Sequence, residues 1–327
     1  MDLPPGVLPP EDAAALSRGE QLEGTVTNAR QYLRKNGPGV WVARRSSRTL
    51  HSIVRHGLPS EFRNDAWFAL SGAKRLMGAT GVGYYQRLLN SRADAGSEAT
   101  AQIEKDVHRT KVREENKDAL RRVLTAVAWH VPSVGYCQSM NFVAALLLNH
   151  LDEEEAFWVL VAIVTELIPE YYSHTMIGVR IDSRVFSAVV SQYLPDVSLR
   201  LDSLGASVAL VSYHWFLCIF ASLTAPQVTA HIWDNFFLRG PIFLLQSGLA
   251  VLSLAHPGID RAADVAEVVV ACKESMMGLA NGAELVERAI AYPLDDDLLT
   301  DLRSRYRAEL LAEEARFDRR TSIIAAP

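Results

Sequence analysis

Three short groups of residues bring together side chains that are able to do chemistry. They are RNDAW at residues 63–67, IEKDVHR at 103–109 and GYCQSMN at 135–141. Among them, Arg109 carries a permanent, forked positive charge, and the amide of Gln138 both donates and accepts hydrogen bonds. Phosphoryl transfer needs charge neutralisation on the phosphoryl oxygens and an aligned water molecule. An arginine and a glutamine are suited to these two tasks.

The second group also has a purely structural explanation. Ile103, Asp106 and Arg109 lie three residues apart, so on a helix they share one face. A local ion pair between Asp106 and Arg109 would stabilise such a helix by roughly a few tenths of a kcal/mol. From this spacing alone the ion pair is the favoured interpretation, and a functional site is the alternative.

Motifs for autonomous nucleotide or metal chemistry are missing from the sequence. It contains no GxxxxGK[ST] loop, GxGxxG, HExxH or GxSxG pattern. The nine histidines are scattered, and His214, within YHWFLCIF, is interpreted as a hydrogen-bonded core histidine and not as a ligand. No histidine is assigned a catalytic role.

The composition is that of a soluble globular protein. Of 327 residues, 49% are hydrophobic and 22% charged, and the net charge of −5 gives no reason to expect nucleic acid as a partner. Cys137, Cys218 and Cys272 are far apart and show no metal-ligand spacing, so we expect neither disulfides nor zinc, and a reducing compartment. The N-terminal residues 1–16 do not resemble a secretory signal.

One apolar stretch is long enough to cross a bilayer, because no Asp, Glu, Lys or Arg occurs between Asp202 and Asp234. A membrane span is one interpretation, and a helix buried in a large helical core is the other. The second is favoured because polar residues and a proline interrupt the stretch: Ser207, Ser212, His214, Thr224, Pro226, Gln227 and His231.

The elements that must position these groups are predicted to be helices. Residues 1–40 show weak periodicity and are expected to be an arm or loosely packed. The first domain helix is predicted to begin near Ser60, after Pro59, and Gly72 can end it. Residues 91–101 are typical of a loop, and residues 120–127 have helical apolar spacing.

Further helices follow, and no segment shows the alternating pattern of strands or a repeat period. The segments 140–151 and 153–167 are strongly apolar, and the acids at 153–155 suit a helix N-terminus. A charged, solvated helix is expected near the C-terminus. These patterns predict an all-α fold, with additional helices at 182–194, 207–223, 226–238 and 242–255.

As an ordered set, the three groups resemble the RxxxW, IxxDxxR and YxQ motifs of the TBC domain family of Rab GTPase activators. The resemblance runs from about Leu50 to about Leu279. It implies a multi-helix TBC domain over residues 50–285, with division into two helical sub-lobes left open. An N-terminal extension (1–49) and a charged, helical C-terminal tail (286–327) would lie outside it.

The resemblance implies that Arg109 is an arginine finger and Gln138 a glutamine finger, both acting in trans on a Rab GTPase in its GTP form. Asp106 would hold the guanidinium of Arg109 or of Arg63, and a plain structural ion pair, with Trp67 as a core tryptophan, is the compatible alternative. The other supporting residues implied are Ile103, Trp67, whose ring would pack beneath that guanidinium, and Tyr136, which would position the Gln138 loop.

No cofactor of the protein's own is expected, since the partner GTPase would carry GTP and Mg²⁺. Contact with membranes would be indirect, through the Rab, and the expected location is cytoplasmic, with recruitment to endomembranes left open. The alternative function is a catalytically inactive TBC-fold binding module or scaffold. The family usually has glycine where this chain has Ser139, and if that position needs a positive φ, serine costs about 1 kcal/mol there.

Overall fold

The structure is a computed structural model that describes residues 29–35, 47–92 and 96–324. Within these ranges the fold is all-α, as predicted, and no strand is present. Most of the predicted N-terminal arm, residues 1–40, lies outside the described residues. The α-helices are α3 (Arg48–His56), α4 (Ser60–Leu70), α5 (Ala73–Thr80), α6 (Tyr84–Ser91), α7 (Glu98–Arg109), α8 (Lys117–His130), α9 (Met140–Leu147), α10 (Glu153–Ala162), α11 (Ile177–Tyr193), α12 (Pro195–Ser203), α13 (Val208–Leu217), α14 (Pro226–Arg239), α15 (Ile242–Arg261), α16 (Val265–Met277), α17 (Ala283–Ile290) and α18 (Asp296–Ile324).

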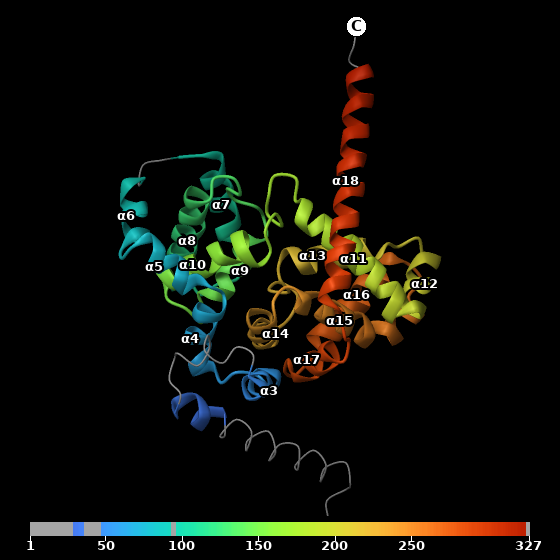
Figure 1. Cartoon of the computed structure of the whole chain (residues 1–327), viewed down its shortest axis with the longest axis horizontal. Helices are drawn as coiled ribbons and strands as arrows, with labels where there is room; N and C mark the ends of the chain where they lie inside the picture. The colour runs from blue at the N-terminus through green and yellow to red at the C-terminus, as the bar shows by residue number, and fades with distance from the viewer. Residues whose placement is uncertain (1–28, 36–46, 93–95, 325–327) are drawn as a thin grey trace, which may run out of the picture.

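The helices form two groups that lie side by side in Figure 1, with α5 to α10 in one and α11 to α13, α15, α16 and α18 in the other. Between them, α14 packs against α3 and α4 on one side and against α15 and α17 on the other. The buried apolar side chains of both groups belong to one continuous core. The two groups are therefore two lobes on a shared core, which resolves the question left open by the sequence.

Several helix boundaries lie where the sequence places them. Helix α4 begins at Ser60, directly after Pro59, and the chain turns at Gly72, whose φ is +87°. Helix α10 begins after Asp152, whose carboxylate accepts a hydrogen bond from the backbone N–H of Glu155 over 2.8 Å. The acids that follow lie in its first turn, where the helix dipole favours negative charge.

Other boundaries differ from the prediction for local reasons. Helix α7 already begins at Glu98, inside the predicted loop, because Ser97 and Thr100 form a reciprocal capping box. Helix α13 ends at Leu217, since Ile219 and Phe220 have φ values of +47° and +62° that no helix continues. Helix α15 continues through Pro257 to Arg261, and α11 begins at Ile177, ahead of the predicted 182.

The apolar stretch between Asp202 and Asp234 forms most of α13 and α14, whose side chains are largely buried in the protein core. This arrangement agrees with the favoured interpretation of a buried helix. Among the described residues, α15 is the helix long and apolar enough to cross a membrane, and most of it is buried in the protein, as in the core helix of a soluble protein.

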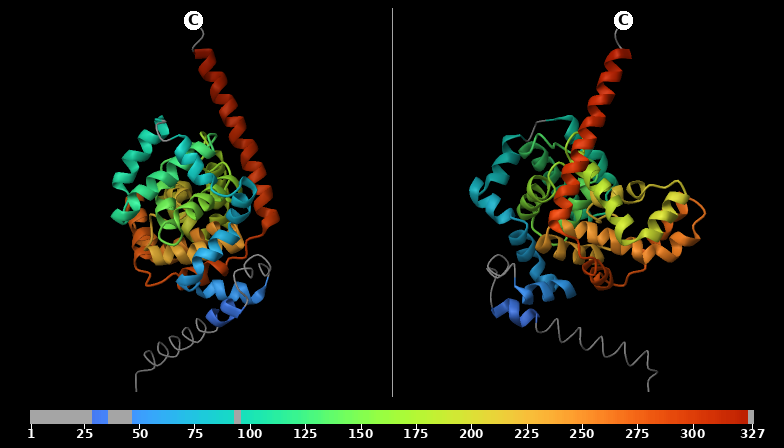
Figure 2. Two further views of the ribbon diagram at one scale, coloured as in Figure 1. Left: turned by 90° about the vertical axis from the view of Figure 1, so that its left-hand side faces the viewer. Right: turned by 45° about the vertical axis from the view of Figure 1, so that its right-hand side comes forward.

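The C-terminal helix α18 is only partly the solvated helix that the sequence predicts. Its first half packs on α11 and buries Leu299 and Leu310, while Leu302 and Tyr306 lie against the same core. Beyond this contact, α18 extends away from the two lobes in all three views (Figures 1 and 2). One face of the charged tail is therefore part of the folded body.

Candidate functional site

The candidate site is built around Arg109, the last residue of α7. Ile103, one turn and a half earlier, is 1% exposed and holds this helix in the core, where α7 packs on α8. The side chain of Arg109 is 54% exposed, so its guanidinium faces solvent at the helix end. A cation at this end is also stabilised by the helix dipole. Helix α7 thus presents a positive, forked donor at the surface of the protein.

A buried carboxylate fixes this guanidinium. Asp106 is 0% exposed, and its Oδ1 atom lies 2.6 Å from Nη2 of Arg109. Its Oδ2 atom accepts a hydrogen bond from the Tyr136 hydroxyl over 2.6 Å. Burial, together with this bond to Asp106, raises the pKa of Tyr136 far above its ordinary value, so the hydroxyl keeps its proton and remains a donor. The pairing of Asp106 with Arg109 is one of the two predicted options, whereas the bond from Tyr136 to Asp106 was not predicted.

Asn141 joins the α7 end to the turn that carries Gln138. Its Nδ2 donates to Oγ1 of Thr110 over 2.7 Å, and its Oδ1 accepts from the backbone N–H of Ser139 over 3.1 Å. Asn141 is 0% exposed, and Thr110 in turn donates to the carbonyl oxygen of Asp106 over 2.6 Å. These two residues were not predicted as site residues, although a polar amide opening an apolar helix is a signal that it needs specific partners.

Gln138 lies on a tight turn between α8 and α9, with its side chain exposed. Its backbone carbonyl oxygen accepts a hydrogen bond from Sγ of Cys137 over 3.4 Å, but its side-chain amide has no hydrogen-bond partner among the described residues and is available to a ligand. The next residue, Ser139, caps α9 with a φ of +102°, in the region that favours glycine. The position therefore does need a positive φ, and serine is strained there.

Arg109 and Gln138 line two different cavities. The first cavity has a volume of about 540 Å³, and its lining includes the polar side chains of Arg109, Lys111 and His214 and the apolar side chains of Phe142 and Leu146. The second cavity, of about 380 Å³, is lined by Gln138 and Tyr136 and by residues 172–174. The Asp106 carboxylate connects the two, because it binds Arg109 in one lining and Tyr136 in the other.

Arg63 and Trp67 do not support Arg109, which corrects that prediction, and the alternative left open for them, a structural ion pair and a core tryptophan, is what the structure shows. Both bind Asp234, which is 0% exposed: Nε of Arg63 lies 3.0 Å from Oδ1, and Nε1 of Trp67 donates to Oδ1 over 2.9 Å. The backbone N–H of Leu58 donates to its Oδ2 over 3.1 Å. Arg63 thus binds Asp234 and not Asp106, the partner that was considered for it. RxxxW thus anchors α4 to α14.

Asp234 itself was missed by the sequence analysis. It is a lone acid in the apolar run HIWDNFF on α14. A buried carboxylate requires a cation or several hydrogen-bond donors, so such an acid signals a distant basic partner. The sequence does not identify that partner, because Arg63 lies 171 positions away.

His214 is not a core histidine, in contrast to the prediction. Its side chain is exposed in α13, where it lines the Arg109 cavity. Its hydrogen-bonding capacity is nonetheless satisfied, since Nε2 lies 3.1 Å from Oγ of Ser222 and 3.3 Å from Sγ of Cys218. Desolvation lowers its pKa, so it is neutral at pH 7.

The three cysteines are free and buried. Burial raises the pKa of Cys137 to about 11 and that of Cys272 to about 12, so their reactive thiolate forms are disfavoured at neutral pH. Within the described ranges, no group of three or more His, Cys, Asp or Glu side chains is arranged to hold a metal ion.

Sequence comparison places this chain among known relatives. Residues 60–259 match the Rab-GTPase-TBC domain family. Small G protein signaling modulator 3 from Mus musculus is 34% identical over 279 residues, which cover 82% of this chain and 37% of that protein. The Homo sapiens protein of the same name gives the same identity and coverage. The chain thus spans little more than a third of the length of these relatives.

Solved structures show the same fold. The Chlamydomonas flagellar RabGAP TBC domain superposes with a TM-score of 0.73 at 24% identity, covering 88% of this chain and 97% of that one. The Ypt/Rab-GAP domain of Gyp1p gives a TM-score of 0.63 at 16% identity, covering 79% of this chain and 92% of that one. Helix α18 lies beyond the residues that match the family, whereas Arg109, Gln138 and Asn141 lie within them.

Proposed function

The chain belongs to the Rab-GTPase-TBC domain family, and from this membership we propose that it accelerates GTP hydrolysis by a Rab-family small GTPase in the GTP form. One observation supports this beyond the family: an exposed guanidinium, that of Arg109, is held by the buried Asp106 carboxylate next to a turn that presents an exposed glutamine, Gln138. An ion pair with a purely structural role does not require a buried carboxylate. Nor does it require the link that this carboxylate makes, through Tyr136, to the turn that carries Gln138.

In the proposed mechanism, Arg109 supplies positive charge to the phosphoryl oxygens of a nucleotide held by the partner. The guanidinium is already oriented by Asp106, so little conformational freedom is lost when it engages. An arginine inserted in this way accelerates GTP hydrolysis by roughly 10³- to 10⁵-fold in related systems. Exposure of the side chain gives it access to a partner surface.

Gln138 has the second task, which is to orient the attacking water. Its neutral amide accepts a hydrogen bond from the water and donates another to the phosphoryl group. The Ser139–Asn141–Thr110 hydrogen bonds fix the turn relative to the end of α7 and so hold the two side chains in a constant relation. Both are delivered in trans, and the partner carries GTP and Mg²⁺, whose charge adds to that of Arg109.

The competing proposal is a TBC-fold module that binds a GTPase without accelerating hydrolysis. Strain at Ser139 is the observation in its favour, because a displaced turn would move Gln138. Location in the cytoplasm, with recruitment to membranes through the Rab, follows from the proposed partner.

A single-turnover GTP hydrolysis screen across a panel of purified Rab proteins tests the proposal. We expect stimulation of at least one of them, and we expect Arg109→Lys to remove most of it, since lysine keeps the charge but loses the fork. Stimulation by Arg109→Lys at the wild-type level would contradict the assignment of Arg109. Binding without stimulation by the wild-type protein would favour the binding module.

A further inference from the structure

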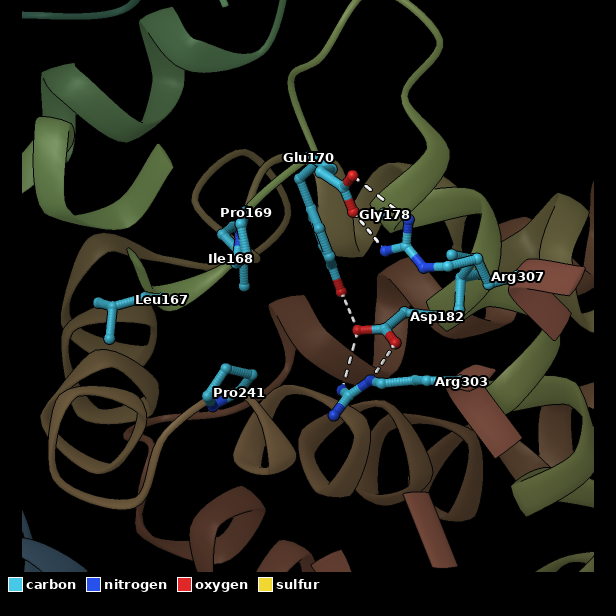
Figure 3. A pocket seen from close by; sticks show the side chains of 11 residues that line it. Leu167, Ile168, Pro169, Glu170, Gly178, Asp182, Pro241, Arg303 and Arg307 are labelled. Carbon is cyan, nitrogen blue, oxygen red and sulfur yellow. Dashed lines mark hydrogen bonds and ion pairs between the residues drawn. The ribbon is translucent and has the colours of Figure 1, made fainter. Parts of the chain in front are cut away.

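Two arginines of α18 are linked to the start of the loop that follows residue 167 and precedes α11, residues 168–176: Arg307 directly, through Glu170, and Arg303 through Asp182 of α11, which also binds Tyr171. Arg303 forms two hydrogen bonds to Asp182, Nε to Oδ1 over 2.7 Å and Nη2 to Oδ2 over 3.0 Å. The hydroxyl of Tyr171 donates to the same Oδ2 atom. Arg307 binds Glu170, with Nη1 lying 3.3 Å from Oε1. Figure 3 shows Glu170 and Asp182 facing these arginines around a cavity of about 190 Å³.

The second half of the same loop forms a wall of the cavity that contains Gln138. Tyr172, Ser173, His174 and Met176 line this cavity together with residues 132–134 and 136–138. The loop therefore has two sets of contacts. Its first residues are bound by α18, and its remaining residues line the cavity of Gln138. The beginning and the wall are adjacent in the chain, so a shift at Glu170 or Tyr171 displaces the residues that follow.

The conformation of the loop leaves it little freedom to absorb such a shift. Glu170 and Met176 have φ values of +66° and +50°, which are strained for residues other than glycine. Gly178 packs so closely on the loop that a Cβ atom there would lie 2.7 Å from the carbonyl oxygen of Pro169. The Tyr172 hydroxyl donates to the carbonyl oxygen of Leu217 over 2.9 Å. Strained backbone of this kind persists only where several contacts enforce it.

We propose that Arg303 and Arg307 are positioning residues for the glutamine: α18, a helix outside the family-matched region, braces the loop 168–176 and so shapes the cavity in which Gln138 meets the GTPase. This inference rests on the proposed function. The two ion pairs differ in environment, since the Asp182 side chain is 6% exposed whereas those of Arg307 and Glu170 are both 44% exposed. The second pair is therefore suited to exchange of its charges without disturbing the core.

The test exchanges the charges of the exposed pair in the full chain. Arg307→Glu and Glu170→Arg each place like charges opposite one another, and the double variant restores an opposite pair. We expect each single variant to lower kcat for stimulated hydrolysis by about fivefold with KM for the GTPase within about twofold, and the double variant to recover most of the loss. Arg288→Glu, at an exposed ion pair with Glu284 on α17, is the matched control and should leave kcat unchanged.

Hydrogen exchange of the loop in the chain alone provides a second readout. Amide exchange of residues 170–176 should rise in both single variants and return to the wild-type level in the double variant. It should also rise in Arg303→Lys, which keeps the charge but loses the paired donors. Two results would overturn the inference that α18 positions the loop. One is raised exchange with unchanged kcat, and the other is a double variant whose kcat is no higher than that of the single variants. Failure of the wild-type chain to stimulate any Rab would instead overturn the proposed function and the inference with it.

Discussion

The Tyr136 hydroxyl donates to Oδ2 of Asp106 over 2.6 Å, while Oδ1 of the same carboxylate lies 2.6 Å from the guanidinium of Arg109. One buried carboxylate therefore connects the end of α7 to the turn that carries Gln138. Two motifs that are 29 positions apart at Arg109 and Gln138 (138 − 109) act as one unit because of this group.

Removal of the Tyr136 hydroxyl should weaken this connection. Tyr136→Phe leaves Asp106 with one donor fewer, and we expect the free energy of unfolding to fall by about 2 kcal/mol, as for other hydrogen bonds to charged groups. Stimulated hydrolysis should fall about tenfold, because Arg109 and the turn lose their common anchor. Urea unfolding and single-turnover hydrolysis measure the two effects. The control is Tyr193→Phe, because the Tyr193 hydroxyl donates to the carbonyl oxygen of Pro293 at the surface. Equal losses of stability and of stimulated hydrolysis in both variants would argue against a special role for Tyr136.

The hydrogen bonds from Arg63 and Trp67 to Asp234 should be a determinant of the stability of the protein. Asp234→Ala removes the acceptor of Arg63 and Trp67 and leaves the Arg63 cation, whose side chain is only 13% exposed, unpaired, which should cost about 3 to 5 kcal/mol. Glu287→Ala is the comparison, since its ion pair with Arg55 is about 40% exposed and should contribute less than about 1 kcal/mol. Chemical unfolding of both variants decides the matter, and similar midpoints for the two would show that Asp234 does not anchor α4.

Replacement of Ser139 should stabilise the protein. At a φ of +102°, Ser139→Gly relieves backbone strain, and we expect a gain of about 1 kcal/mol with stimulation retained. Ser212→Gly in the middle of α13 should have the opposite sign and cost about 1 kcal/mol, because glycine is unfavourable in a helix interior. A destabilised Ser139→Gly protein would mean that contacts of the hydroxyl outweigh the strain.

His150 should make stability depend on pH. Burial, with a smaller effect of Arg63, lowers its pKa in the folded protein to about 4, below the ordinary value of about 6.5. Between these values the unfolded chain binds a proton that the folded chain does not, so the free energy of unfolding falls as the pH falls through this window. His150→Phe keeps a ring against Trp67, whose centroid lies 4.8 Å away, but does not titrate. Urea unfolding at about pH 7.5, 6 and 5 should therefore show a shallower dependence for this variant, and identical slopes would contradict the assignment.

The sequence predicts what depends on neighbouring residues. Spacing places Asp106 and Arg109 on one helix face, and the start of α4 at Ser60 follows from Pro59. Membership of the family is confirmed by the match over residues 60–259, and the all-α fold by the helices of the described residues. The roles of Arg109 and Gln138 remain predictions.

Contacts between distant residues were beyond the sequence. Asp234 binds Arg63 across 171 positions, and Arg303 binds Asp182 across 121. No spacing rule connects such residues, because tertiary packing of whole helices brings them together. The prediction for His214 was wrong for a related reason. The apolar sequence around it is typical of a buried helix, but its side chain lies on the face of α13 that lines a cavity.

The most direct test asks where the water-orienting glutamine comes from. GTP hydrolysis is measured for a stimulated Rab and for its variant with leucine at the switch glutamine, each with the wild-type protein and with Gln138→Ala, and binding is measured separately. We predict that the leucine variant is still substantially stimulated by the wild-type protein and that Gln138→Ala abolishes stimulation of both forms. Stimulation of the wild-type Rab by Gln138→Ala within a few-fold of normal would contradict the account and make Gln138 a structural residue of its turn.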